Sequence, residues 1–371
     1  MLKNPQEDSV TPLVRPTRRL RAAASAAALL TATALLAGCG GDDAGPRLGL
    51  DEPIPDDVPS DTVLRVGDPT TQVALELSGL DDDLPFDIEW ANISGGPKTL
   101  EAFRGDALDV GSVADIPPLF AKWTGTDVRI IATRETVDPL DHPTYELGVA
   151  PGVEVDELTD LAGKKIAYSP GQAQGALVLK VLKEAGLTQD DVELVEMASV
   201  DDTYVNALGS NQVDVAPLGQ TLVPPFLAKY EQDGAHTVSP GVRDDYWNLY
   251  VPTAVLEDEH KAAALRKYAD LWAQAQTWIN EHPDEFAQGF YVEHEGLSEE
   301  DAAYLVDALG EKSVPQDWSE IIAGHQETAD LLATEQGHDQ LDVEALFDRR
   351  FEPGNDGALP SGSSDEKAAE Q

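Results

Sequence analysis

The sequence predicts an α/β protein of two lobes, each built on a largely parallel sheet that helices cover. Strand-like and helix-like segments alternate from Val63 to Ala216, which is typical of parallel strands joined by helical crossovers. A helix–turn–strand pattern also occurs twice, as GDALDVG at 105–111 and as GSNQVDVA at 209–216. With 371 residues, of which 42% are hydrophobic, the chain is long enough for two such lobes.

The first run of elements is read from apolar patterning and from its breakers. Pro97, directly after Gly96, suits the first position of a helix, and Gly105 suits its end. A second helix begins near Asp115 and stops at Gly125. The predicted strands of this run are residues 63–66, 86–90, 108–111 and 128–132, and the predicted helices are residues 97–105 and 115–125.

The second run repeats this order and is followed by a helical region. Gly171 turns the chain into a helix that Gly186 closes, and Asp201 is a plausible cap for the next helix. Beyond Trp247 the pattern becomes helical, with breaks at Pro283 and Pro315. The strands predicted here are 164–168, 192–195 and 213–216, and the helices are 171–186, 201–208, 262–280, 298–309 and 319–332.

The N-terminus is typical of an export signal. Four arginines between Arg15 and Arg21 precede an apolar run over 22–36, which is too short for a convincing membrane span. The only cysteine, Cys39, follows Leu-Ala-Gly, and this tetrapeptide resembles the bacterial lipoprotein box, in which the cysteine is acylated. The alternative is an ordinary signal peptide that ends near a cysteine. We expect a lipoprotein signal peptide over 1–38 and lipidation of Cys39.

Both flanks of the folded region are expected to be disordered. Residues 39–61 are rich in Gly, Pro and Asp without apolar periodicity, so they predict an extended tether between lipid and lobe. Residues 353–371 are similarly poor in apolar side chains and predict a frayed tail.

Composition excludes several classes of function. A formal net charge of -44 repels phosphate backbones, which argues against nucleic-acid binding. One cysteine rules out a disulfide scaffold and a Cys-rich metal site. The sequence contains no Gly-x-Ser-x-Gly, no His-Glu-x-x-His and no phosphate loop, and its seven histidines are dispersed. We therefore expect no cofactor, no metal and no enzymatic activity.

Several motifs together resemble one family, the sulfonate, taurine and nitrate-type solute-binding proteins of ABC importers. No motif is decisive alone, but their order and spacing are specific, and the resemblance extends over 62–351. The motifs are Gly96-Pro97, LDVGS at 108–112, DIPP at 115–118, LTDLAGKKIA at 158–167, Trp278 with EHPDE at 281–285, and QETADL at 326–331.

The resemblance implies the type II periplasmic binding protein fold, in which two α/β lobes close on a ligand in the cleft between them. Lobe one would hold residues 62–145 and, with the C-terminal helices, 241–352; lobe two would hold 146–240. The partners would be a small organic anion, foremost an aliphatic sulfonate or related sulfur compound, and a membrane permease with its ATPase. The protein would be a monomer held at the outer face of the membrane through the lipid on Cys39.

Three alternatives stay open at this point. The same fold serves binders and enzymes that act on pyrimidine or thiamine precursors, and it serves binders of nitrate. A surface lipoprotein with a purely structural role is a third reading, against which the glycine-rich helix starts in both lobes argue.

The resemblance also implies a ligand site at helix N-termini. Their free N–H groups and the helix dipole hold an anion without any lysine, and small residues let the backbone approach it. The direct contacts are expected from Gln72, Ser94, Ser169, Gln172 and Gln220. The nearest basic residues, Lys98 and Arg134, are interpreted as solvated or structural charges. The full set is Asp68, Thr70, Thr71, Gln72, Ser94, Gly95, Gly96, Pro97, Val113, Ala114 and Asp115 in lobe one, and Ser169, Gly171, Gln172, Ala173, Gln174, Gly219 and Gln220 in lobe two.

Overall fold

The computed structural model of the protein describes residues 46–355. The predicted signal peptide, the lipidation site Cys39 and residues 356–371 of the predicted tail lie outside the described residues. No helix within 46–355 combines the length and the apolar character needed to cross a membrane.

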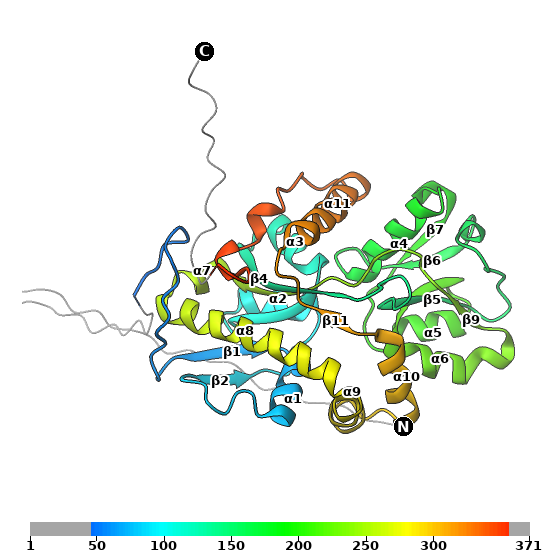
Figure 1. The fold of residues 1–371 in the computed structure, drawn as a ribbon. Coiled ribbons are helices and arrows are strands. Elements are labelled where there is room, and N and C mark those ends of the chain that lie inside the picture. Colours follow the sequence, from blue (N-terminus) through cyan, green and yellow to red (C-terminus); the bar gives the residue numbers. More distant parts are fainter. Residues whose placement is uncertain (1–45, 356–371) are drawn as a thin grey trace, which may run out of the picture. The chain divides into compact units, whose positions relative to one another are not determined.

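The first sheet has six strands in the order β11-β4-β10-β3-β1-β2 (Figure 1). β1 is parallel to β2 and to β3, whereas β10 is antiparallel to both β3 and β4, so the sheet is mixed. The strands are β1 (Val63–Gly67), β2 (Asp87–Trp90), β3 (Val110–Ala114), β4 (Val128–Thr136), β10 (Trp247–Pro252) and β11 (Lys312–Ser313).

The second sheet has five strands in the order β7-β6-β8-β5-β9. β6 is parallel to β7 and to β8, and β5 is antiparallel to β8 and to β9. The strands are β5 (Tyr145–Val149), β6 (Lys165–Tyr168), β7 (Glu193–Glu196), β8 (Val215–Gly219) and β9 (His236–Val238). The chain therefore enters this sheet once and returns to the first sheet at β10.

The two sheets share one topology, which is the structural basis of the repeated sequence pattern. The order β2-β1-β3-β10-β4 in the first matches β7-β6-β8-β5-β9 in the second. Asp106 and Asn211 stand at equivalent places in the repeated turn, and both take the left-handed backbone conformation, with φ of 50° and 52°. Asp and Asn tolerate this conformation better than most side chains. The predicted α/β fold of two lobes is confirmed, and both sheets are mixed where the sequence pattern indicated largely parallel ones, because β10 and β5 run antiparallel to their neighbours.

Helices cover both sheets, and most begin within a few residues of their predicted starts. α1 was not predicted, and the helical pattern expected from Trp247 onward is wrong for its first six residues, which form β10 in the middle of the first sheet. The helices are α1 (Pro69–Ser78), α2 (Gly96–Arg104), α3 (Ile116–Trp123), α4 (Ala173–Glu184), α5 (Thr203–Gly209), α6 (Val223–Tyr230), α7 (Thr253–Leu256), α8 (Glu259–Glu281), α9 (Pro283–Phe286), a π-helix (Ala287–His294), α10 (Glu299–Leu309) and α11 (Ser319–Gln336).

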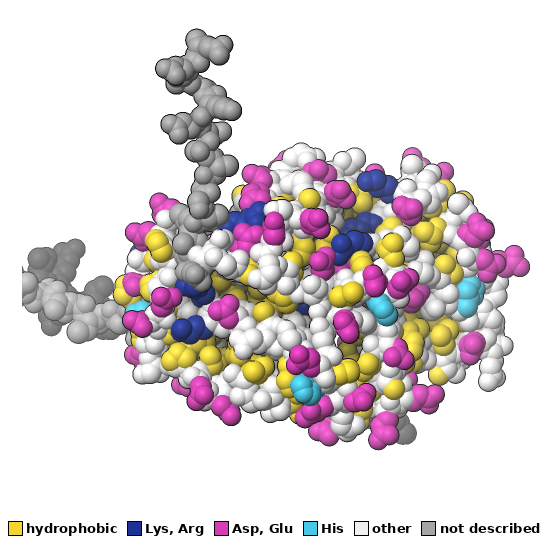
Figure 2. All heavy atoms as spheres, in the orientation of Figure 1, with side chains coloured by type: hydrophobic (Ala, Val, Ile, Leu, Met, Phe, Trp, Pro, Cys, Tyr) yellow, Lys and Arg dark blue, Asp and Glu magenta, His cyan; other side chains and the backbone are white. Residues whose placement is uncertain are grey.

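Two C-terminal helices contact elements of the second sheet's lobe. α11 packs against α4, and α10 packs against the short 3-10 turn Gln220–Leu222. The surface is strongly acidic: Figure 2 shows carboxylates spread over the face in view, with few lysines or arginines between them.

The predicted tether over 39–61 is wrong for residues 46–61, which pack onto the folded body. Leu48 and Ile54 are buried, and Leu48 N donates to Glu257 O at 2.8 Å while Glu259 N donates to Pro46 O at 2.8 Å. The prediction failed because a few isolated apolar residues give no periodicity, although Leu48 and Ile54 are buried in the core and Leu50 and Val58 pack against it.

A buried ion pair near the C-terminus fastens this N-terminal segment. Arg350 Nε donates to Asp348 Oδ1 at 2.9 Å, and both side chains are almost fully buried. The remaining nitrogen Nη1 donates to the carbonyl oxygens of Gly49 and Glu52, at 3.2 and 2.9 Å. The predicted disordered tail over 353–371 is wrong for residues 353–355. Asn355 Nδ2 donates to Arg349 O at 2.7 Å, which holds these residues next to the same turn.

We expect Arg350→Met to lower the free energy of unfolding by about 3–5 kcal/mol, because it leaves the Asp348 carboxylate buried without its cation. Chemical denaturation measures this change, and limited proteolysis should show faster cleavage between residues 46 and 61. The matched control is Arg104→Met, whose guanidinium contacts Thr124 and Thr126 at the surface and whose loss should cost less than about 1 kcal/mol. Equal effects of the two substitutions would contradict the assignment.

Candidate functional site

The residues predicted after the first strand lie on α1 and not on a loop. Asp68 caps this helix: Thr71 N donates to its Oδ1 at 3.2 Å, and Thr71 Oγ1 donates to its Oδ2 at 2.7 Å. Burial raises the pKa of Asp68, and the Thr71 hydrogen bonds oppose this shift. Gln72 points away along the helix surface, where its Nε2 donates to Glu76 Oε1. The N-terminus of α1 is therefore already capped by a carboxylate.

The glycine corner at α2 packs against the start of α3. A Cβ on Gly96 would come within 2.3 Å of Pro117 Cγ, so glycine is required there by helix packing. Gly95 has φ of 83° with open space beside it, and Ser94 is exposed. Asp115, at the start of α3, forms an ion pair with Lys180 of α4, with 3.4 Å between Oδ2 and Nζ.

The predicted site residues before α4, in the second lobe, also contact α3. A Cβ on Gly171 would come within 2.8 Å of the Phe120 ring. The Gln172 amide is engaged with the backbone of Ser199, since its Nε2 donates to Ser199 O at 3.1 Å and its Oε1 accepts from Ser199 N at 3.0 Å. Ser169 is buried, and its Oγ has no hydrogen-bond partner. Ala173 and Gln174, the first residues of α4, are partly exposed.

Gln220 follows β8, and both ends of its amide are hydrogen-bonded within the protein. Its Nε2 donates to Pro143 O at 2.8 Å, and its Oε1 accepts from the Tyr304 hydroxyl of α10 at 2.6 Å. Gly219 precedes it at the end of β8. The structure thus places Gly96 and Gly171 against α3 and Asp115 at its start. Thr71 and Gln72 lie in the first turn of α1, and Gln220 contacts Pro143 and Tyr304.

A cavity of about 630 Å³ lies beside β4, β10 and the ends of α8 and α10. Of the residues that the resemblance implicates, only Thr70 lines it. Its polar and charged lining includes Arg134, Thr136, His142, Asp245 and Lys312. Its apolar lining includes Trp247, Ile279, Phe286, Phe290, Tyr291 and Leu305.

The feature that sets this cavity apart is Arg134, near the end of β4. Its Nε is buried without a hydrogen-bond partner, and the side chain forms no ion pair with any residue of 46–355. The guanidinium instead lies over the ring of Trp247, its cross-strand neighbour on β10, with 5.5 Å from Cζ to the ring centroid. Burial lowers the pKa of Arg134 to about 10, and attraction to Asp68 and Asp245 opposes this shift.

Lys312 supplies a second cation to the same cavity. Its Nζ donates to Thr136 Oγ1 at 2.9 Å and to the carbonyl of Leu309. Burial lowers the pKa of Lys312 to about 7, and repulsion from Arg134 acts in the same direction. Half-buried Arg134, whose Nε lacks a hydrogen-bond partner, and Lys312, whose pKa is lowered to about 7, are the groups that an anion would pair with.

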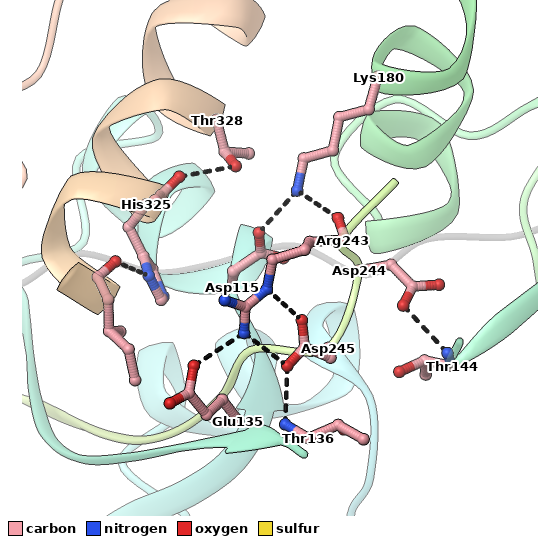
Figure 3. Close-up of polar contacts among 12 residues, drawn as sticks. Asp115, Glu135, Thr136, Thr144, Lys180, Arg243, Asp244, Asp245, His325 and Thr328 are labelled. Atoms are coloured by element: carbon pink, nitrogen blue, oxygen red, sulfur yellow. Dashed lines mark hydrogen bonds and ion pairs between the residues drawn. The ribbon is translucent and has the colours of Figure 1, made fainter. Parts of the chain in front are cut away.

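The wall of the cavity continues into the two segments that connect the sheets (Figure 3). Asp245 lines the cavity, and its Oδ2 accepts from Thr136 N at 2.7 Å while its Oδ1 accepts from Arg243 Nε at 2.9 Å. The next carboxylate, Asp244, accepts from the backbone N–H groups of Thr144 and Tyr145, each at 3.0 Å. Burial raises the pKa of Asp244 to about 7. These bonds tie one crossover segment to the other.

Sequence reasoning underweighted Arg134 and missed Trp247 and Lys312. The signal available was a basic residue at the end of an otherwise apolar strand, in RIIATRET at 129–136. Recognising Arg134 as a candidate site residue requires knowing that it pairs with Trp247, more than 100 residues later, and no local sequence pattern shows this pairing. Among residues 46–355, no three His, Cys, Asp or Glu side chains are grouped so as to hold a metal ion.

Comparison with known proteins reveals relatives by sequence and by structure. A curated Escherichia coli K12 protein named "Putative aliphatic sulfonates-binding protein" is 25% identical over 245 residues, which cover 66% of this chain and 74% of that protein. The crystal structure of the periplasmic aliphatic sulphonate binding protein SsuA from Escherichia coli matches with a TM-score of 0.63 at 20% identity, covering 82% of this chain and 96% of the other.

Two further structures show how widely this fold is used. The alkanesulfonate-binding protein SsuA from Xanthomonas axonopodis pv. citri, bound to MOPS, matches with a TM-score of 0.63 at 20% identity over 78% of this chain and 99% of that chain. The desulfurization enzyme DszB matches with a TM-score of 0.51 at 16% identity over 77% of this chain and 96% of that chain. These structures establish the periplasmic binding protein fold.

Residues 97–286, just over half of the chain, match the family described as NMT1/THI5 like. This stretch runs from the start of α2 to the end of α9, so it includes Arg134, Trp247 and the whole second sheet. The chain belongs to the NMT1/THI5-like family.

Proposed function

We propose that the protein is the extracytoplasmic solute-binding component of an ABC importer, that it captures a small organic anion, foremost a sulfonate, and that Arg134 holds the anionic group. The observation that carries this proposal is the Arg134 guanidinium in the 630 Å³ cavity, whose Nε is buried without a hydrogen-bond partner. A buried charge is costly unless it is paired, so an anion that enters the cavity supplies the missing partner.

Charge and relatives support this assignment over the alternatives. The sequence relative is named "Putative aliphatic sulfonates-binding protein". A sulfonate group is a permanent anion whose three oxygens can accept hydrogen bonds from a forked guanidinium. A planar nitrate ion would use the cations but would leave the apolar part of the cavity unfilled. The protein acts by binding and not by turnover.

The geometry also suggests how binding becomes a signal. Asp245 contributes to the cavity wall and to the bonds between the crossover segments, so an anion at Arg134 changes the field at the hinge. Ligand would then shift the population toward the arrangement of the lobes that binds it best, in proportion to its differential affinity. The permease would recognise the protein in that arrangement of its lobes.

The lipid anchor is a separate part of this proposal. The Leu-Ala-Gly-Cys sequence at 36–39 supports acylation of Cys39, which would keep the binder next to its permease.

One prediction concerns the ligand and the role of Arg134 in holding it. In a thermal-shift screen against alkanesulfonates, taurine, sulfate esters, nitrate and pyrimidines, a sulfonate at a hundredfold over its Kd should stabilise the protein by about 2.7 kcal/mol. Arg134→Gln should weaken that binding at least ~30-fold, because the anion loses its buried charge partner. The matched control, Arg129→Gln on the same strand, removes a guanidinium that pairs with Asp127 and should keep the affinity. Turnover of any ligand, or equal binding by both variants, would contradict the proposal.

The second prediction follows from the lowered pKa of Lys312. A sulfonate stays ionised throughout the accessible pH range, so only the protein titrates. A bound anion favours the charged ammonium, so affinity is highest below pH 7 and falls as the pH rises through 7, by at most about tenfold per pH unit.

Calorimetric titrations from pH 6 to pH 9 measure this profile. Lys312→Met should flatten it. The other groups that face this lysine or line the cavity are Arg134, Asp138, His142, Asp244, Asp245, Asp307 and Glu311, and a His142→Gln variant separates any imidazole contribution. A pH profile that Lys312→Met leaves unchanged would refute the role of this ammonium.

The third prediction concerns Cys39. When the full chain is produced in a bacterium, labelled palmitate should be incorporated into the protein, which should sediment with membranes. Cys39→Ser should abolish the label and release the protein into the soluble fraction, because no other cysteine is present to carry the lipid. Label retained in the serine variant would exclude the lipoprotein assignment.

A further inference from the structure

One wall of the cavity is an aromatic cluster formed by the π-helix and its neighbours. Phe286 and Phe290 stack with 5.3 Å between ring centroids, and Tyr291 meets Phe290 edge-on at 5.3 Å. Trp247 forms the floor beneath Arg134. Trp247, Phe290 and Tyr291 are partly exposed although all three line the cavity, so part of their surface remains uncovered by protein.

The size of the cavity fits more than an anionic head group. About 630 Å³ lies within the range of pockets that enclose ring-containing small molecules. A two-carbon sulfonate would pair with Arg134 but would leave most of the aromatic wall against water. A flat ring would instead stack on that wall, and aromatic pairs gain free energy beyond the area they bury.

The charges around the cavity also limit the ligand. The two cations, Arg134 and Lys312, are partly buried and lie near the buried carboxylate of Asp245. The other lining carboxylates, Asp138, Asp307 and Glu311, are exposed. A ligand whose anionic group meets the cations therefore directs its other end toward carboxylates. A second negative charge at that end would be repelled.

Building on the proposed function, we propose that this cavity selects monoanionic arylsulfonates, with one or two fused rings, over alkanesulfonates of the same carbon count. The sulfonate pairs with Arg134 and Lys312, and the ring lies between Trp247 and the Phe290–Tyr291 face. The aromatic wall sets the preference for the ring, and the exposed carboxylates set the preference for a single charge.

Calorimetry with matched ligands tests this preference. Benzenesulfonate should bind about tenfold more tightly than cyclohexanesulfonate, which has the same carbon count and head group but no π-face. Naphthalene-2-sulfonate should bind at least as tightly as benzenesulfonate, and naphthalene-2,6-disulfonate should bind at least ~10-fold more weakly than the monosulfonate.

Two phenylalanine variants locate the selectivity. Phe290→Leu keeps an apolar side chain but removes the ring, and it should reduce the preference for benzenesulfonate to less than about threefold. Phe351→Leu makes the same change at a buried phenylalanine that does not line the cavity, and it should keep the full preference. A thermal melt of each variant verifies that it is folded.

The outcomes separate the two proposals. If cyclohexanesulfonate binds as tightly as benzenesulfonate, or if Phe290→Leu retains the preference, the arylsulfonate assignment is wrong and the binding-protein assignment stands. If no sulfonate of either kind binds, the proposed function itself is wrong.

Discussion

The proposed function depends on one unfavourable arrangement: the half-buried guanidinium of Arg134, whose Nε is buried without a hydrogen-bond partner. Arg134 has the ring of Trp247 on one side and feels Asp68 and Asp245 only through space. Both effects compensate part of the cost of removing a charge from water, but neither satisfies its N–H groups. Folding therefore leaves an electrostatic deficit at a defined place, and an anion of the right shape removes it.

This local arrangement operates against the charge of the whole molecule. With a formal net charge of -44, the surface repels anions at long range, although salt screens exposed charges beyond about 8 Å. Inside the cavity the effective dielectric constant is lower, so a short contact with Arg134 or Lys312 outweighs many distant carboxylates. Under the proposed function, this cavity would give a strongly acidic protein its affinity for an anion.

The fold could be predicted from the sequence further than the site could. Alternating elements and the repeated turn at Asp106 and Asn211 are local signals, and they were sufficient for the two lobes. β10 was missed because a strand that returns from a distant part of the chain is recognisable only by the partners it finds. The same limit applies to Arg134, whose meaning depends on Trp247 across that pairing.

The predicted glycine corners illustrate a second limit. Gly96 and Gly171 do permit close approach, but the approaching groups are Pro117 and Phe120 of the protein itself. A small residue at a helix start indicates close approach of another group, but the sequence does not distinguish a ligand from another part of the protein. Leu48 and Ile54 show the converse, since isolated apolar residues in a polar stretch were sufficient to dock it.

The double role of Asp245 has a consequence for how transport would be regulated. Arg243 donates to both of its oxygens, and the backbone N–H of Thr136 donates to one of them. The same carboxylate therefore belongs to the cavity wall and to the contact between the crossover segments. Thermodynamic coupling of this kind is reciprocal. If docking onto a transporter separates the lobes, it would therefore lower the affinity for the ligand. Ligand release would then need no further change within the cavity.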